Sequence, residues 1–172
     1  MKGIQKLWRY KMGAVPSINF KVREGNEWVE TNSHEMFKDK KVIIFSLPGA
    51  FTPTCSTQQL PGYESMFEKF QEKGIDEIYC ISVNDSFVMN AWAQAHNIKK
   101  VKMIPDGSGE FTRQMGYLVD KDNLGFGKRS WRYAALIDNI NLEHTWAEDG
   151  KMDNCPTDPY EKSKPENVLD QI

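Results

Sequence analysis

The cysteine at position 55 is the residue of this chain best placed for chemistry. It follows Thr52 by three residues and Pro53 by two. Threonine is a good helix N-cap, because its hydroxyl can accept a hydrogen bond from an unpaired backbone N–H, and proline suits the first helical position. The pattern predicts that Cys55 is the third residue of a helix, among free N–H groups at the positive end of the helix dipole.

A thiol in that position is expected to be reactive. The nucleophile is the thiolate, and free N–H groups together with the dipole favour the anion, so we expect the pKa of Cys55 to fall. The alternative is a buried, inert cysteine that fills space, which is the commoner fate of an isolated cysteine. Because the cap, the proline and the helix start agree here, we favour the reactive thiol.

The elements that must position Cys55 are a buried strand, a tight loop and a helix. Residues 42–45 form a continuous apolar run, which is typical of a strand covered on both faces. Pro48 breaks this strand. The helix that carries Cys55 is expected to kink at residues 61–62, which are proline and glycine, and to stop at Gly74.

The rest of the chain alternates strand and helix patterns and ends in a hairpin. The hairpin is expected to turn at Asp138 and Asn139. Its second arm would place Ile140, Leu142, His144 and Trp146 on one face. This order predicts an α/β fold with a mixed central sheet flanked by helices. The expected strands are 15–22, 27–31, 77–83, 102–104, 131–137 and 140–146, the helices 33–37, 85–97, 109–116 and 165–172, and the longer loops 121–129 and 148–164.

The motif P-x-x-x-T-x-x-C, formed here by Pro48, Thr52 and Cys55, is the peroxiredoxin signature, and the chain resembles that family. The segment PGAFTPTCS is similar to the subgroup of the fifth mammalian form and the plant type II enzymes. The resemblance runs from position 15 onward and also reaches bacterial forms fused to a glutaredoxin, although no glutaredoxin domain follows here. Further matching segments are ISVND, NAW, PDGSGEFT and GKRSWRYA, at residues 81–85, 90–92, 105–112 and 127–134.

The resemblance implies a thioredoxin fold and a thiol-dependent peroxidase that reduces hydrogen peroxide and alkyl hydroperoxides. Cys55 would attack the peroxide and become a sulfenic acid, while Thr52 and backbone N–H groups bind the peroxide oxygens. Arg132 would supply the fixed positive charge that holds those oxygens and stabilises the thiolate. Pro48 would shield the site and shape its loop. No cofactor is expected.

Two arginines compete for the role of that cation. From the residues alone, Arg132 would be a surface arginine on a strand edge, so its role depends on the resemblance. Arg129 comes three residues earlier, and strand alternation would put it on the other face. We therefore expect that Arg129 does not touch the peroxide and at most supports the residues that do.

The sulfenic acid must then be reduced by another thiol. Cys80 matches the second cysteine of plant type II relatives, but a strand cysteine is more often an inert core residue. Cys155 lies five residues after Gly150, the offset of the resolving cysteine in the mammalian form, and a loop cysteine can move easily. The surrounding segment DNCPTDPY departs from that form. We expect glutathione or glutaredoxin as the reductant, with Cys155 and a thioredoxin donor as the alternative.

Composition excludes several other classes of function. A chain of 172 residues suits one domain, and its net charge of -2 argues against nucleic acid and anionic membranes as partners. Its apolar runs are too short to span a bilayer. Three widely spaced cysteines favour a reducing, cytoplasmic location. The sequence contains no C-x-x-C, no nucleotide fingerprint and no metal-ligand spacing around the histidines at 34, 96 and 144, so no metal is expected.

Residues 1–14 are expected to be a short N-terminal extension that precedes one domain at 15–172. They are basic and free of acidic residues, so part of a mitochondrial presequence is the alternative. Because the resemblance starts just after Met12, Met12 is a candidate initiator. The resemblance also implies a homodimer whose contact lies beside the active-site loop, with Phe51 and Trp92 nearby.

Two rival functions remain open on the same fold. A redox sensor would use the reactive cysteine to signal and would be oxidised once, whereas a peroxidase cycles with a reductant. A structural thioredoxin-like module would carry an inert Cys55 that alkylates slowly at neutral pH. Neither the preferred peroxide nor the reductant follows from the sequence.

Overall fold

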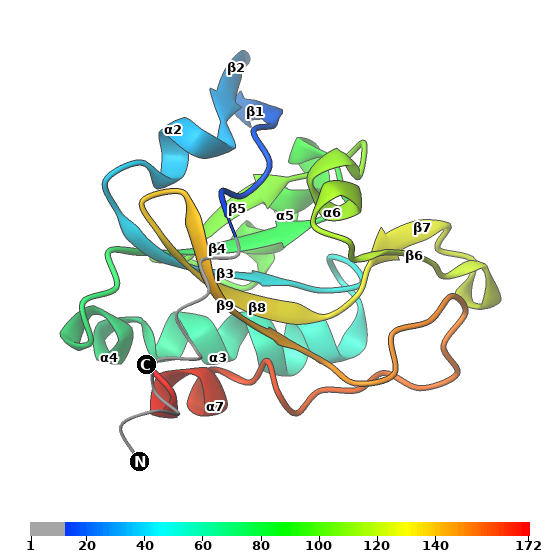
Figure 1. Cartoon of the computed structure of the whole chain (residues 1–172). Coiled ribbons are helices and arrows are strands. Elements are labelled where there is room, and N and C mark those ends of the chain that lie inside the picture. Colours follow the sequence, from blue (N-terminus) through cyan, green and yellow to red (C-terminus); the bar gives the residue numbers. More distant parts are fainter. Residues whose placement is uncertain (1–12) are drawn as a thin grey trace.

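A mixed central sheet organises the computed structural model, which describes residues 13–172 (Figure 1). Within these residues the sheet has five strands in the order β5-β4-β3-β8-β9. Neighbours β3, β4 and β5 are parallel, whereas β8 is antiparallel to both β3 and β9. The strands are β3 (Lys41–Ser46), β4 (Glu77–Ser82), β5 (Lys102–Pro105), β8 (Tyr133–Asp138) and β9 (Asn141–Ala147).

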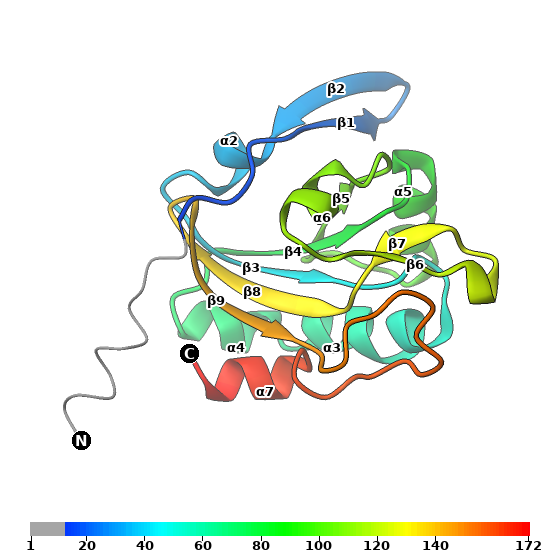
Figure 2. The same cartoon turned by 45° about the vertical axis from the view of Figure 1, so that its right-hand side comes forward.

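Both faces of this sheet are covered. Figure 2 shows α3, α4 and α7 along one face and the β1–β2 hairpin with α2 on the other. The predicted α/β fold with a mixed sheet flanked by helices is confirmed. The covering elements are β1 (Asn19–Glu24), β2 (Glu27–Asn32), α2 (Ser33–Phe37), α3 (Leu60–Ser65), α4 (Phe67–Glu72), α5 (Ser86–Ala95), α6 (Glu110–Gln114) and α7 (Pro165–Asp170).

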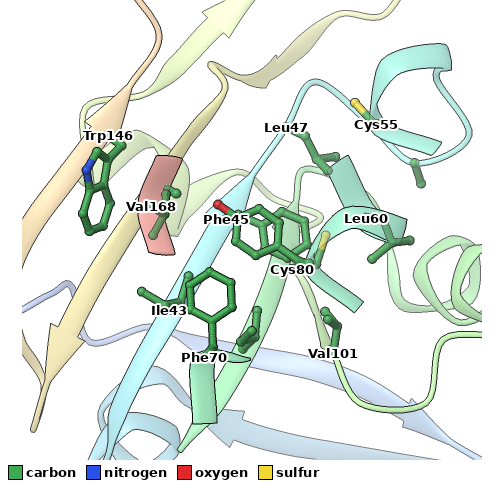
Figure 3. Packing of buried hydrophobic residues seen from close by; sticks show 14 of the residues in the cluster. Ile43, Phe45, Leu47, Cys55, Leu60, Phe70, Cys80, Val101, Trp146 and Val168 are labelled. Carbon is green, nitrogen blue, oxygen red and sulfur yellow. The ribbon is translucent and has the colours of Figure 1, made fainter. Parts of the chain in front are cut away.

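The apolar run of strand β3 is continuous because its side chains are buried on both faces of the sheet. Ile43 and Phe45 point into the core beneath α3 and α4, whereas Val42 and Ile44 point into a second core beneath the hairpin and α2. All four side chains are fully buried. Phe45 stacks on Tyr63 of α3 with ring centroids 4.1 Å apart. Figure 3 shows this first core, with Cys55 at its edge beside Leu47.

The helix caps follow the sequence pattern. The Asn32 side chain accepts from the backbone N–H of His34 at the start of α2, and Asp85 accepts from Val88 at the start of α5. Gly74 has φ 90° just after α4, where a residue without Cβ is favoured. The predicted stop at Gly74 is thus confirmed.

The last hairpin differs from its prediction in two ways. Its turn lies one residue later, at Asn139 and Ile140, which both have positive φ. The pairing then slips, because Leu136 pairs with His144 while Ile137 pairs with Leu142. An extra residue in one strand turns the following side chains to the other face. Leu142 therefore packs in the second core and Trp146 in the first, so the predicted single face is wrong.

The predicted loop 121–129 is flanked and partly replaced by short regular elements. Strands β6 (Leu118–Asp120) and β7 (Lys128–Ser130) pair antiparallel around a single 3-10 turn, Asp122–Leu124. No helix within residues 13–172 is long and apolar enough to cross a membrane. Residues 1–12 lie outside the described part of the chain, so the extension, the presequence alternative and the Met12 initiator remain predictions.

Candidate active site

The helix that carries Cys55 begins where the sequence predicts. Helical backbone starts at Pro53, and the Thr52 carbonyl accepts from the N–H of Ser56 at 3.0 Å. Cys55 is thus the third helical residue. The Thr52 hydroxyl does not make the predicted capping bond to a first-turn N–H; it donates to the Gly49 carbonyl at 2.7 Å. It therefore fixes the loop against the helix start.

The turn after Cys55 is wider than an α-helical turn. Residues Cys55–Gln59 form a π-helix, η1, in which the N–H of Leu60 donates to the Cys55 carbonyl. Pro61 follows in the first turn of α3, and because it has no N–H it cannot continue the hydrogen-bond series that Leu60 makes with Cys55. The interruption expected around residues 61–62 thus takes the form of a π-to-α change, and the helix itself breaks at Met66. Such π segments are frequent at functional sites.

Arg132 lies directly against Cys55. Its Nη1 donates to the Cys55 sulfur at 3.4 Å and also to the side-chain oxygen of Gln59. Its Nη2 donates to the carboxylate of Asp158 at 2.6 Å, and the Tyr160 ring lies 5.4 Å from its guanidinium carbon. Cys55 is 1% exposed and Arg132 is 2% exposed. A permanent cation is therefore held beside the sulfur, away from water.

The charges around this guanidinium explain how it tolerates burial. Burial lowers the pKa of Arg132, but the Cys55 sulfur and the Asp158 carboxylate outweigh it and raise that pKa above its usual value. Two donors stay unused, because the Nε of Arg132 and the amide nitrogen of Gln59 are buried without a partner. Buried donors are normally satisfied. Both belong to side chains that meet at Arg132 Nη1, which itself contacts the Cys55 sulfur.

Arg129 lies behind the loop rather than on the sulfur. Its Nη1 donates to the Pro48 carbonyl at 3.2 Å and its Nε to the Phe126 carbonyl at 3.2 Å. Burial lowers its pKa. A Cβ on Gly49 would collide with this guanidinium, so a larger residue there would require the Arg129 side chain to shift. Pro48 and Gly49 therefore lie directly against the Arg129 side chain.

The other two cysteines have different surroundings. Cys80 is fully buried between Phe45 and Leu60 (Figure 3), and burial followed by the nearby Cys55 raises its pKa well above its usual value. Cys155 lines an apolar pocket of about 340 Å³ that Pro48 and Thr52 also line. Cys80 is therefore closed off from solvent, whereas Cys155 shares a pocket with residues of the active-site loop.

The environment of Cys155 favours its thiolate. Burial raises its pKa, but hydrogen bonds from Thr157 and the charge of Lys121 outweigh burial, so that pKa is lowered. Its sulfur lies 3.5 Å from the Thr157 hydroxyl. All three cysteines are free thiols. Within residues 13–172, no group of three histidine, cysteine or carboxylate side chains is placed to hold a metal.

The two residues expected near a dimer contact differ in exposure. Phe51 is 54% exposed and has a positive φ of 63°. Trp92 is fully buried, and its indole N–H donates to the Ser56 hydroxyl at 3.0 Å. Trp92 therefore packs inside the chain against the helix of Cys55.

Three residues at this site escaped sequence reasoning. Gln59 follows Cys55 by four residues, so helical spacing could have placed it on the same face. Asp158 and Tyr160 come from the loop before α7 and had no local signal, because only the path of that loop brings them to Arg132.

The sequence of this chain matches a known family model and is similar to several known proteins. Residues 13–163 match the family model described as Redoxin. A peroxiredoxin of Rhizobium etli is 56% identical over 164 residues, which cover 90% of this chain and 92% of that protein. The hybrid peroxiredoxin hyPrx5 of Haemophilus influenzae is 48% identical over 155 residues, which cover 90% of this chain and 63% of the relative.

The fold of this chain is also similar to that of several solved structures. The Plasmodium falciparum antioxidant protein, described as a 1-Cys peroxiredoxin, superposes with a TM-score of 0.88 at 38% identity and covers 92% of this chain and 96% of its own. Reduced Prx3 of Vibrio vulnificus in complex with H2O2 superposes with a TM-score of 0.84 at 36% identity. That match covers 94% of this chain and 97% of Prx3.

Proposed function

This chain belongs to the peroxiredoxin family of thiol peroxidases, and we propose that Cys55 is the residue that attacks the peroxide. The observation that carries this proposal is the 3.4 Å contact between Arg132 Nη1 and the Cys55 sulfur in a buried site. A buried guanidinium favours the thiolate over the thiol. The substrates are hydrogen peroxide and alkyl hydroperoxides.

The reaction is a two-electron transfer from sulfur to peroxide. The Cys55 thiolate attacks one peroxide oxygen, an S–O bond forms, and the O–O bond breaks. The departing oxygen takes up a proton and leaves as water or an alcohol, and Cys55 becomes a sulfenic acid. Arg132 and the first-turn N–H groups stabilise the charge on the departing oxygen, while Pro48 and Thr52 hold the loop around it.

Glutathione or glutaredoxin then reduces the sulfenic acid. One thiol replaces the hydroxyl as a mixed disulfide and releases water, and a second thiol regenerates Cys55 and leaves as the disulfide. Burial of Cys80 supports an external reductant, as does the likeness to a protein described as a 1-Cys peroxiredoxin. The alternative is a Cys55–Cys155 disulfide reduced by thioredoxin, which the pocket shared by Cys155 and Thr52 supports.

Turnover with defined reductants tests this proposal. Wild type, Cys80→Ser and Cys155→Ser would be assayed with hydrogen peroxide, first with glutathione and glutaredoxin and then with thioredoxin. We expect cycling with glutathione in all three proteins. If only thioredoxin supports turnover, and Cys155→Ser abolishes it, the alternative holds. Oxidation that stops after one equivalent with every reductant would identify a redox sensor instead.

Cellular context follows as part of the same proposal. We place the protein in the cytoplasm, where thiol reductants are abundant. We also propose a homodimer whose contact includes the exposed Phe51 beside the active-site loop. Sedimentation at several concentrations would test the dimer, and a monomer at every concentration would refute it.

A further inference from the structure

Arg132 is held in its orientation from two independent directions. Gln59 belongs to the same π-helix as Cys55, so any movement of that turn carries both residues together. Asp158 belongs to the loop between β9 and α7 and accepts from Nη2 at 2.6 Å. With Nε unpartnered, Asp158 is the polar contact that fixes the guanidinium independently of the Cys55 turn.

The loop that carries Asp158 is itself anchored beside Arg132. The N–H of Glu148 donates to the Arg132 carbonyl at 3.1 Å. The Glu148 carboxylate accepts from the N–H groups of Glu161 and Lys162 at 2.8 Å, and from the N–H and hydroxyl of Ser163 at 2.9 and 2.7 Å. Both ends of the loop are therefore tied together, as in a compact Ω-loop.

We propose that Asp158 is a positioning residue of the peroxidase reaction, which holds Arg132 Nη2 so that Nη1 is directed at the Cys55 sulfur. This inference rests on the proposed function. A guanidinium is a planar fork, so fixing one nitrogen fixes the direction of the other. Without Asp158, the guanidinium of Arg132 loses one of its anchors and can rotate so that Nη1 no longer points at the sulfur.

The same carboxylate also competes for the charge of Arg132. Asp158 and a Cys55 thiolate lie on opposite nitrogens of one cation, so the aspartate offsets part of the attraction that the thiolate feels. Geometry and charge can be separated by substitution. Asparagine keeps an oxygen that accepts from Nη2 and removes the charge, whereas alanine removes both.

Two measurements on Asp158→Asn and Asp158→Ala test the proposal. One is the rate constant for oxidation of the reduced protein by hydrogen peroxide, and the other is the pH profile of alkylation by iodoacetamide. We expect Asp158→Ala to react with peroxide about 10- to 100-fold more slowly, because the guanidinium is misplaced. Asp158→Asn should stay within about threefold of wild type, since the anchor survives. Its alkylation profile should move to lower pH.

The control is Asp149→Asn, on the same loop but paired with Lys162 at the surface, which should match wild type in both measurements. A peroxide rate for Asp158→Ala within twofold of wild type would overturn the proposal. If that variant does not fold, Asp158→Asn decides: a peroxide rate more than about tenfold below wild type would overturn the proposal, because the retained anchor would then not sustain the rate. Failure of the wild-type protein to react with peroxide would instead overturn the proposed function.

Discussion

At Arg132 a cation is buried to 2% exposure without losing its charge. An unpaired buried charge is strongly unfavourable, so a guanidinium persists in such a place only if its partners compensate. Asp158, the Gln59 oxygen, the Cys55 sulfur and the Tyr160 ring provide that compensation. In the proposed reaction, this arrangement keeps positive charge fixed where negative charge develops as the peroxide is cleaved.

Replacing Arg132 should therefore affect the reaction sharply. We expect Arg132→Lys to lower kcat/KM for hydrogen peroxide by about 10²- to 10³-fold, because an ammonium cannot contact sulfur, Gln59 and Asp158 at once. Steady-state kinetics would measure it. Arg113→Lys, at an exposed ion pair with Glu110, is the control and should match wild type. A loss below threefold in Arg132→Lys would contradict the assigned role.

At the scale of single residues, the sequence predicted some members of this site and missed others. Cys55 and its helix position followed from local rules, because cap and proline preferences act within a few residues. Arg132 was found through the family resemblance, since its neighbours alone indicated a surface arginine. Asp158 was missed because its contact with Arg132 spans 26 positions in the chain, and no local pattern encodes that approach.

Among the elements, the π-helix η1 is the one that we expect to move during the proposed reaction. Because the sulfur is 1% exposed, a reductant as large as glutathione cannot reach it directly, and we expect the segment Cys55–Gln59 to open when Cys55 is oxidised. The wider turn and the nearby prolines bound the stretch that can unwind, with Pro53 before it and Pro61 after it.

Hydrogen exchange checks this opening. We expect amides of Cys55–Gln59 to exchange faster in protein oxidised with one equivalent of peroxide and glutathione than in reduced protein. Amides of the central strand Glu77–Ser82 should stay equally protected in both forms and serve as the internal reference. Exchange in the π-helix that does not change on oxidation would contradict the expected unwinding.

The loop before α7 depends on one ionised carboxylate. Burial alone would raise the pKa of Glu148, but hydrogen bonds from Ser163 and from the amides of Lys162 and Glu161 outweigh it and lower that pKa. A lowered pKa means that the carboxylate stabilises the fold fully above its unfolded pKa of about 4.3. This contribution is lost as the pH falls through the lower pKa of the folded state.

Denaturant unfolding of Glu148→Gln at pH 7 and pH 3 would test this dependence. At pH 7 we expect the variant to be less stable than wild type by about 1–3 kcal/mol, because a charged acceptor of several hydrogen bonds is replaced by a neutral one. At pH 3 the difference should shrink. Glu143→Gln serves as the control, with an effect below about 0.5 kcal/mol. A difference that is equal at both pH values would contradict the account.

Element prediction succeeded where the pattern was long or the caps were specific, as in α2, α5 and β3. It failed in the last hairpin, because the extra residue between Ile140 and Trp146 looks like ordinary strand sequence. Only packing against two separate cores decides which side chains turn over. The short β6–β7 pair was missed because glycine and charge dominate that segment.

At the scale of the whole molecule, one hydrophobic core packs on each face of the sheet, and Cys80 is held immobile in one of them. It lies within the first core with its thiol fully buried. We expect Cys80→Ser to lower the free energy of unfolding by about 1–3 kcal/mol, because a hydroxyl is buried in apolar surroundings. Its rate of oxidation by peroxide should equal that of wild type. Unfolding curves and stopped-flow oxidation would check both, and a slowed oxidation would contradict the assignment of Cys80 to the core.

The fold class followed from the sequence, because strand and helix periods alternate and the central strands are apolar throughout. The strand order did not, since nothing local determines which strands pair. The thioredoxin fold came from the family resemblance. Long-range pairing and the course of the loop before α7 are properties of the whole chain, and they are also what completes the site around Cys55.

The central claim is that Cys55 is the residue oxidised by peroxide. Intact and peptide mass spectrometry after one equivalent of hydrogen peroxide, with no added thiol, tests it most directly. We predict one added oxygen on Cys55 as a sulfenic acid, which glutathione converts to a mixed disulfide and then removes. A disulfide between Cys55 and Cys155 would agree with peroxidase activity but would make thioredoxin, in place of glutathione, the expected reductant. An unmodified Cys55 would contradict the account.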